Sequence, residues 1–134
     1  MNQLAKGSFS VTLTNRMFEG AAADSKLARM AIDKTISGDL VATTQGQMLS
    51  AMGQVAGSAG YVAIERVSGE LQGRRGSFVL QHCGVMDRSQ PTMSITVVPD
   101  SGTDELVGLS GDFSISMVDG EHTYEFSYQL DGAA

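Results

Sequence analysis

The chain has 134 residues, of which 42% are apolar and 18% are charged, so it is neither disordered nor membrane-like by composition. Fifteen acidic and nine basic residues leave a formal charge of −6, which argues against nucleic acid because phosphate contacts need clustered lysine and arginine. Cys83 is the single cysteine, so an internal disulfide and a zinc site built on several thiolates are excluded.

The length suits one compact domain, which we place at residues 1–134 with a core at about 7–131. Residues 1–15 contain no apolar run of signal-peptide length. No stretch approaches the roughly 20 apolar residues of a membrane-spanning helix. We therefore expect a cytoplasmic protein that works without a membrane.

Apolar and polar residues alternate along the first half of the chain, with the period of two that is typical of half-buried strands. Small polar residues at 19–26 predict a loop, and residues 51–57 predict another, with one helical turn from Met48 to Val55 as the alternative. Gly46 is a candidate β-bulge. The predicted strands lie at about 7–18, 27–37, 40–50 and 60–67.

The second half continues the alternation, with a hairpin turn predicted at 71–76 and a loop at 99–105. Asp119-Gly120 is a strong signal for a type I′ turn, which would pair Val118 with Glu121 and would place a mainly aromatic face on one side of the ribbon. The predicted strands lie at about 77–85, 91–98, 106–118 and 121–131.

Eight strands joined mostly by short turns leave few architectures, because no helix is present to cover an open sheet. Closing the sheet on itself removes both exposed edges and buries one face of every strand. We therefore predict an all-β fold, an eight-stranded antiparallel up-and-down barrel, with a two-sheet sandwich as the alternative. The interior of such a barrel is either filled by side chains or holds one small ligand.

The strands at 60–67 and 77–85 carry the most suggestive pair of polar residues. A two-residue turn at Gly73-Arg74 would place Glu65 directly opposite His82, on faces that are otherwise apolar. A carboxylate beside an imidazole shifts the pKa values of both groups and is suited to general acid–base catalysis. The alternative is a cross-strand pair that only satisfies two buried polar groups, and a register change of one residue would separate the two.

Further residues are candidates for contact with a ligand inside the barrel. Tyrosines offer hydroxyl groups, although such residues also serve as core packing with the hydroxyl at the rim. Methionines line adaptable apolar pockets, although they also fill gaps in a glycine-rich core. The same register predicts that Arg66 faces Gln81. The candidate ligand-binding residues are Tyr61, Arg66, Gln81, Tyr124, Met48 and Met117.

The sequence shows no spacing typical of a metal site, since its two histidines, His82 and His122, lie far apart. It also lacks a phosphate-binding loop and a nucleophile elbow, so we expect neither a metal nor a cofactor. Asp33 and Lys34 are adjacent on a predicted strand, so one of the two points inward, and the pattern does not decide which.

The following segments form a recognisable set: GDL (38–40), GQMLSA (46–51), SAGYVAIERVSGEL (58–71), GRRGSFVLQHCG (73–84), VVPDSGTDELVGLSG (97–111) and DGEHTYEFSYQL (119–130). Together they resemble the domain-of-unknown-function family 3224, a family of small, mostly bacterial proteins. The resemblance covers about residues 7–131 and implies a barrel similar to that of allene oxide cyclase. Barrels of that type include cyclases that shape an apolar substrate, and they are often oligomeric, so the resemblance implies a homo-oligomer, a dimer or a trimer. It assigns no catalytic residue.

Three functions follow as hypotheses. The first is a barrel that binds a small apolar molecule, oriented by a few inward polar groups. The second is a cyclase or isomerase that uses Glu65 and His82 as acid and base. The third is a solid barrel with a structural role, acting through oligomerisation. We rank ligand binding first.

Overall fold

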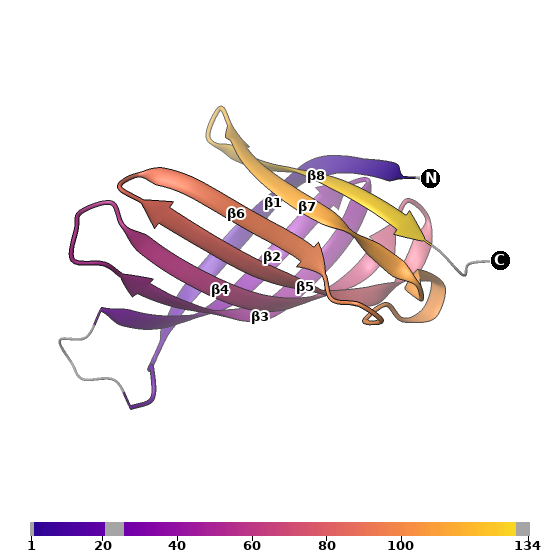
Figure 1. The fold of residues 1–134 in the computed structure, drawn as a ribbon. Coiled ribbons are helices and arrows are strands. Elements are labelled where there is room, and N and C mark those ends of the chain that lie inside the picture. The colour runs from indigo at the N-terminus through magenta and orange to yellow at the C-terminus, as the bar shows by residue number, and fades with distance from the viewer. Residues whose placement is uncertain (1, 21–25, 131–134) are drawn as a thin grey trace.

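The computed structural model describes residues 2–20 and 26–130. Its strands form a closed barrel in which each strand pairs antiparallel with the next, and β8 returns to pair with β1 (Figure 1). One 3-10 helix, η1 (Asp104–Leu106), lies between the sixth and seventh strands. The strands are β1 (Gln3–Arg16), β2 (Leu27–Gly38), β3 (Leu40–Met52), β4 (Ala59–Leu71), β5 (Arg74–Asp87), β6 (Gln90–Val97), β7 (Leu109–Val118) and β8 (Glu121–Leu130).

The predicted eight-stranded up-and-down barrel is confirmed, and the sandwich is wrong. β3 extends to Met52, so the helical turn from Met48 to Val55 is also wrong. β7 begins at Leu109 rather than at 106, because η1 and Gly108, with a φ of 88°, precede it. Residues 21–25 of the predicted loop and residue 131 of the predicted last strand lie outside the described residues. Within the described part of the chain, no helix is long and apolar enough to cross a membrane.

The β7–β8 turn forms as the sequence predicts. Asp119 and Gly120 both have positive φ angles, 51° and 78°, as a type I′ turn requires. Val118 therefore pairs with Glu121, and the register continues through Phe113 opposite Phe126. These pairs give β7 and β8 the shared aromatic inner face that the sequence indicates.

The register between β4 and β5 differs from the prediction by two residues. The turn residues are Gln72 and Gly73, both with positive φ, so Leu71 pairs with Arg74. Glu65 therefore lies opposite Leu80 rather than opposite His82. A shift of two residues leaves every side chain on its predicted face, so Glu65 and His82 still point to the same side of the sheet.

One half of the barrel is packed with side chains. Aromatic rings from β5, β7 and β8 stack there, with ring centroids 5.2 to 5.7 Å apart. Leu106 of η1 packs against this cluster and is 1% exposed. We call this the packed half. Its stacked rings are those of Phe78, Phe113, Phe126 and Tyr128.

The loops β3–β4 and β5–β6 lie at the opposite end of the barrel (Figure 1). Methionines occupy its inward positions but stay accessible to solvent. Met93 of β6 is 51% exposed and Met117 of β7 is 60% exposed. We call this the open end.

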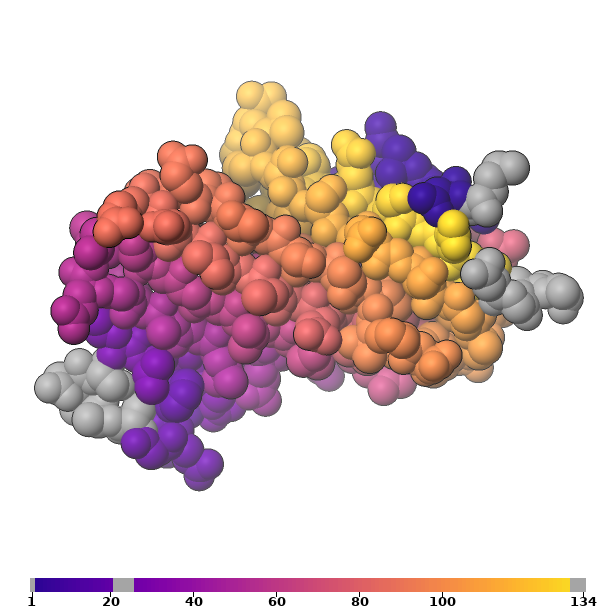
Figure 2. Space-filling model, viewed as in Figure 1, coloured from indigo at the N-terminus to yellow at the C-terminus, as the bar shows by residue number. Residues whose placement is uncertain are grey.

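The contact between β6 and β7 is the weakest in the barrel. Thr96 and Asp112 are the one pair of partner residues among the described residues of these two strands, whereas every other neighbouring pair of strands has a continuous ladder. Toward the open end the β7–β8 hairpin leans away from β6 (Figure 1), and Figure 2 shows a notch between that hairpin and the end of the β5–β6 hairpin. We call this gap the seam.

The two halves should respond differently to truncation of their side chains. Phe126→Ala removes a fully buried ring, so we expect the free energy of unfolding to fall by about 3–5 kcal/mol. Met117→Ala, at the open end, should change it by less than about 0.5 kcal/mol because most of that side chain is already in water. Urea unfolding of both variants checks this. Equal losses would contradict the division into a packed half and an open end.

Candidate functional site

A cluster of polar side chains lies inside the barrel, between the packed half and the open end. Four consecutive strands each contribute one of them. Glu65 is the most deeply buried, with no exposed surface. A buried charge of this kind is costly unless hydrogen-bonding partners replace its lost hydration. The members of this polar cluster are Lys34 from β2, Thr44 from β3, Glu65 from β4 and His82 from β5.

The Glu65 carboxylate accepts a hydrogen bond from each of the other three side chains. Nζ of Lys34 lies 2.9 Å from Oε1, and Nε2 of His82 lies 2.6 Å from the same oxygen. Oγ1 of Thr44 donates to Oε2 at 2.7 Å. Both carboxylate oxygens are therefore satisfied, as burial demands.

These partners decide the protonation state of Glu65. Burial by itself raises the pKa of the carboxyl group, because a buried charge loses its hydration. The hydrogen bond from His82, together with the charge and the hydrogen bond of Lys34, outweighs burial and lowers the pKa from 4.5 to about 2. Glu65 is therefore ionised at neutral pH.

Gly46 makes room for this carboxylate. It is the register partner of Glu65 on β3, and a Cβ atom built on it would lie 2.6 Å from both Cα and Cβ of Glu65. Any other residue would push β4 away from β3 at this point. Gly46 lies in an unbroken ladder, so the predicted β-bulge is wrong, and the close approach explains the glycine.

Lys34 has a second neighbour on the side of β1. Its Nζ lies 4.9 Å from the centre of the Phe9 ring, an arrangement in which the aromatic face attracts the ammonium group. Phe9 in turn stacks on His122, with ring centroids 5.0 Å apart. The polar cluster is thus bounded by aromatic side chains on this side.

Above the cluster, the open end contains an apolar hollow of about 270 Å³, which we call the mouth hollow. Its lining comes from strands β3 to β6, and it contains no charged residue. The lining residues are Met48, Ser50, Ala59, Gly60, Tyr61, Gly84, Val85, Met86, Pro91, Thr92 and Met93.

Tyr61 connects the mouth hollow to the polar cluster. Its ring centroid lies 6.3 Å from that of His82. Gly84 faces it across β4 and β5, and a Cβ atom there would lie 2.2 Å from the Tyr61 ring, so only glycine leaves space for the ring. Burial raises the pKa of the Tyr61 hydroxyl, and the negative charge of Glu65 adds to the effect. The hydroxyl therefore stays protonated and is available as a donor.

Of the ligand-binding candidates, Met48 and Tyr61 line the mouth hollow. Met117 lies at the same end but is mostly exposed to solvent. Tyr124 is in the packed half, where its hydroxyl donates to the carbonyl oxygen of Ser37 at 2.9 Å and accepts from the Leu40 N–H at 3.0 Å. It therefore fastens the barrel wall and does not reach the mouth hollow.

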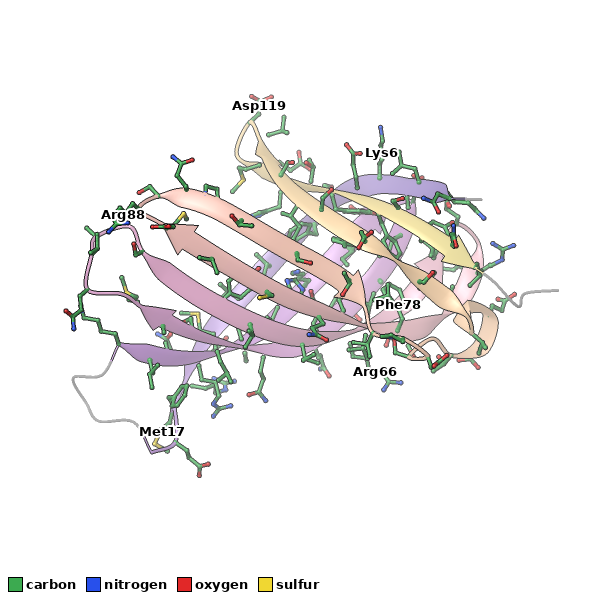
Figure 3. All side chains as sticks on the ribbon, viewed as in Figure 1. Lys6, Met17, Arg66, Phe78, Arg88 and Asp119 are labelled. Carbon is green, nitrogen blue, oxygen red and sulfur yellow. The ribbon has the colours of Figure 1, made fainter. Side chains whose placement is uncertain are left out.

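Arg66 and Gln81 are exposed on the outer face, so neither can touch a molecule held inside the barrel. Figure 3 shows Arg66 pointing away from the barrel, whereas Phe78 lies within it. Arg66 donates from Nη2 to Oγ of Ser77 at 3.2 Å, and it lies opposite Val79 rather than Gln81. The predicted pairing of Arg66 with Gln81 is wrong, for the same reason as that of Glu65 with His82.

The sequence reasoning missed four residues that shape the site. Strand alternation restricted the inward residue to Asp33 or Lys34, and the structure selects Lys34, while Asp33 is exposed. Thr44 follows directly after Thr43 on β3, and the sequence does not distinguish the two. Gly46 and Gly84 lie opposite the large inward side chains of Glu65 and Tyr61, and we call them spacer glycines because they leave room for those side chains. The strand register, once known, is the signal that identifies them.

The described residues hold no group of three or more His, Cys, Asp or Glu side chains that could bind a metal ion. Nor does the polar cluster itself contain an open set of ligands, since both Glu65 oxygens already accept hydrogen bonds.

Comparison with known proteins identifies the family. The family model described as "Protein of unknown function (DUF3224)" matches residues 5–128. The chain belongs to this family. A crystal structure of a protein of unknown function from the DUF3224 family of Shewanella oneidensis MR-1 is similar to it, with 49% sequence identity and a TM-score of 0.94. The alignment covers 99% of this chain and 100% of that one. No curated protein matches the chain.

The membership confirms the resemblance read from the sequence, and the shared fold is that of an eight-stranded barrel. The similarity to allene oxide cyclase stays a prediction. Neither the family model nor the similar crystal structure brings an activity or a ligand, so the proposal of a function rests on the geometry of the open end.

The polar cluster predicts how stability depends on pH. Because the pKa of Glu65 is about 2 in the folded protein and near 4.5 in the unfolded chain, the free energy of unfolding should fall as the pH drops from about 4.5 to about 2. The shift corresponds to roughly 3 kcal/mol. Urea unfolding across this pH range measures the loss.

The matched variants are Glu65→Gln and Glu121→Gln. Glu65→Gln leaves Lys34 without its anionic partner, so we expect it to be less stable than the wild type at pH 7 and to approach the wild type as the pH falls to 2. Glu121→Gln, at an exposed position beside a turn, should follow the wild type at every pH. A constant gap between Glu65→Gln and the wild type would show that the carboxylate does not carry the pH dependence.

Proposed function

We propose that the protein binds a small apolar molecule in the mouth hollow. The observation that carries this proposal is an inward, uncharged, largely apolar lining that the core does not fill. Exposed apolar surface of this kind is costly for a soluble fold and commonly marks a binding site. It also argues against the solid barrel that a purely structural role would suggest.

The size of the hollow limits the ligand. At about 270 Å³ it holds the volume of roughly nine water molecules, just below the range of about 300–1,000 Å³ for small-molecule sites. Its flexible methionines, Met48, Met86 and Met93, adapt to different apolar shapes. The Tyr61 hydroxyl has no hydrogen-bond partner among the described residues, so it is free to orient one polar atom of the ligand.

The polar cluster lies beside the hollow, next to Tyr61, and none of its four members belongs to the lining. It holds its charges within a closed set of hydrogen bonds, so a bound molecule meets little unsatisfied charge. The net charge of −6 further favours a neutral ligand over an anionic one. The class we propose is therefore a neutral apolar molecule with at most one hydrogen-bond acceptor.

Binding can be measured with N-phenyl-1-naphthylamine, a neutral dye whose fluorescence rises in apolar surroundings. Met48 and Leu49 are neighbours on β3 that point to opposite faces, so they give a matched pair of variants. Met48→Glu introduces a charge into the mouth hollow and should weaken dye binding at least tenfold. Leu49→Glu, on the outer face, should leave it within twofold of the wild type.

The two variants separate the interior from the outer surface. Loss of binding in Leu49→Glu alone would place the dye on the apolar outer face of β3 to β5 and would overturn the proposal. Circular dichroism and the midpoint of urea unfolding establish that each variant is folded before the affinities are compared.

A cyclase or isomerase is the second candidate, and the observation that favours it is the 2.6 Å contact between Glu65 and His82. The low pKa of Glu65 weighs against it, since a carboxylate that is hard to protonate is a weak base. Acid–base catalysis at this site would therefore depend on His82, whose ring centroid lies 6.3 Å from that of Tyr61 in the lining of the mouth hollow.

The simple ketone 3-cyclohexen-1-one distinguishes the two functions, because moving its double bond into conjugation requires a proton to be removed and another to be added. We expect the wild-type protein to leave the rate of this conversion, followed by ultraviolet absorbance, at the level of buffer. A faster conversion that disappears in Glu65→Gln and His82→Gln, while dye binding persists, would establish the enzyme instead.

A further inference from the structure

Methionine side chains gather on the inner face of the open end. Five of the eight methionines of the chain lie there, at inward positions of five different strands. By volume, leucine would line this end equally well, and the two residue types usually replace each other in a core at little cost. The thioether sulfur distinguishes methionine, because it accepts an oxygen atom from a peroxide. These residues are Met30, Met48, Met86, Met93 and Met117.

Met86 and Met93 combine an inward position with access to solvent. Both line the mouth hollow, and they are 41% and 51% exposed. Neither belongs to the buried core cluster. Oxidation of a methionine usually damages a fold because it forces a polar oxygen into packed apolar surroundings. An oxygen atom on Met86 or Met93 enters the hollow instead, so the fold can carry it.

Met93 and Tyr61 are neighbours across Gly84. The three residues form one row on the inner face, because Gly84 is the register partner of Tyr61 on β4 and of Met93 on β6. The Tyr61 ring leans over Gly84, where a Cβ atom would lie 2.2 Å from it, and thus toward Met93. A sulfoxide oxygen on Met93 is a hydrogen-bond acceptor, so it competes with the ligand for the Tyr61 hydroxyl.

We propose that Met86 and Met93 form a reversible oxidation site that switches off binding in the mouth hollow. This inference rests on the proposed function and adds its regulation. In the reduced state, both side chains present apolar surface to the ligand. In the oxidised state, each carries a polar sulfoxide group, which loses its hydration without a replacement when an apolar molecule covers it.

The oxidant is a hydroperoxide, of which hydrogen peroxide is the simplest. The sulfur lone pair attacks one peroxide oxygen, so an S–O bond forms while the O–O bond breaks. The departing hydroxide takes the proton from the transferred oxygen and leaves as water, and the peroxide gains the two electrons that the sulfur loses. A thiol-dependent methionine sulfoxide reductase reverses the step: two thiols become a disulfide, and the oxygen leaves as water.

Treatment with hydrogen peroxide provides the first test. Every protein carries Cys83→Ser, because Cys83 is exposed and its thiol would also be oxidised. Peptide mass spectrometry locates the added oxygen atoms. We expect the oxidised protein to bind N-phenyl-1-naphthylamine about tenfold more weakly or worse, with an unchanged midpoint of urea unfolding. Methionine sulfoxide reductases should restore binding. An oxidised protein that has unfolded, or one whose binding the reductases do not restore, would overturn the switch.

A matched pair of variants assigns the effect to the hollow. Met86→Leu with Met93→Leu keeps the apolar volume but removes both sulfurs, so dye binding should survive peroxide treatment. Met17 is 76% exposed, and Figure 3 shows it outside the barrel. Met17→Leu removes an accessible sulfur that does not line the hollow, so this variant should lose binding as the parent protein does. Equal losses in both variants would contradict the assignment.

A second measurement keeps all methionines in place. A bound molecule covers the side chains of the hollow, so saturating dye should slow the oxidation of Met86 and Met93 by about threefold or more. The oxidation of Met17 should proceed at the same rate with and without dye. Rates that do not respond to the dye at any of the three residues would show that the dye does not rest on these sulfurs, against the inference.

The outcomes separate the inference from the proposed function. If the unoxidised protein does not bind the dye, the proposed function and the inference both fail. If it binds the dye and the oxidised protein binds it equally well, the mouth hollow remains the binding site and the inference alone fails.

Discussion

The buried negative charge of Glu65 is the constraint on which the interior of this barrel depends. A carboxylate without contact with water has to receive hydrogen bonds on both oxygens, and here the donors come from three different strands. Lys34, Thr44 and His82 can reach it only if β2 to β5 all turn the correct face inward. The spacer Gly46 brings β3 close enough for the arrangement to close. One ionised group thus ties together the register of half the barrel.

Much of this fold can be predicted from the local sequence, because the alternation of apolar and polar residues and the turn-forming residues depend only on residues that are close together in the chain. Asp119-Gly120 specified its own turn and register. Glu65 and His82 were brought together correctly despite a wrong turn position, since a slip of two residues preserves the face. That Lys34 rather than Asp33 points inward depends instead on Glu65, its partner 31 residues away in the chain. The seam depends on how two hairpins meet across the barrel, which no local pattern records.

The division of the interior explains how the fold tolerates an unfilled end. Stacked rings such as Phe126 in the packed half supply the burial that a domain of this size needs, so the open end does not have to contribute much to stability. The polar cluster lies between the two regions and separates them. Its groups form hydrogen bonds with each other, so they need no further partners. The packing that stabilises the barrel and the mouth hollow therefore occupy different lengths of the same strands.

The pairing of β1 with β8 has a consequence for how the protein is made. These two strands, the first and the last of the sheet, form a ladder from Gln3 opposite Tyr128 to Phe9 opposite His122. Partners so distant in the chain close a very large loop, and such contacts slow the folding reaction. While the ribosome is still adding β8, the nascent sheet has two free edges and no closed ring. Completion of the cylinder is therefore a late event, after which the amino-terminal strand no longer offers an edge to other chains.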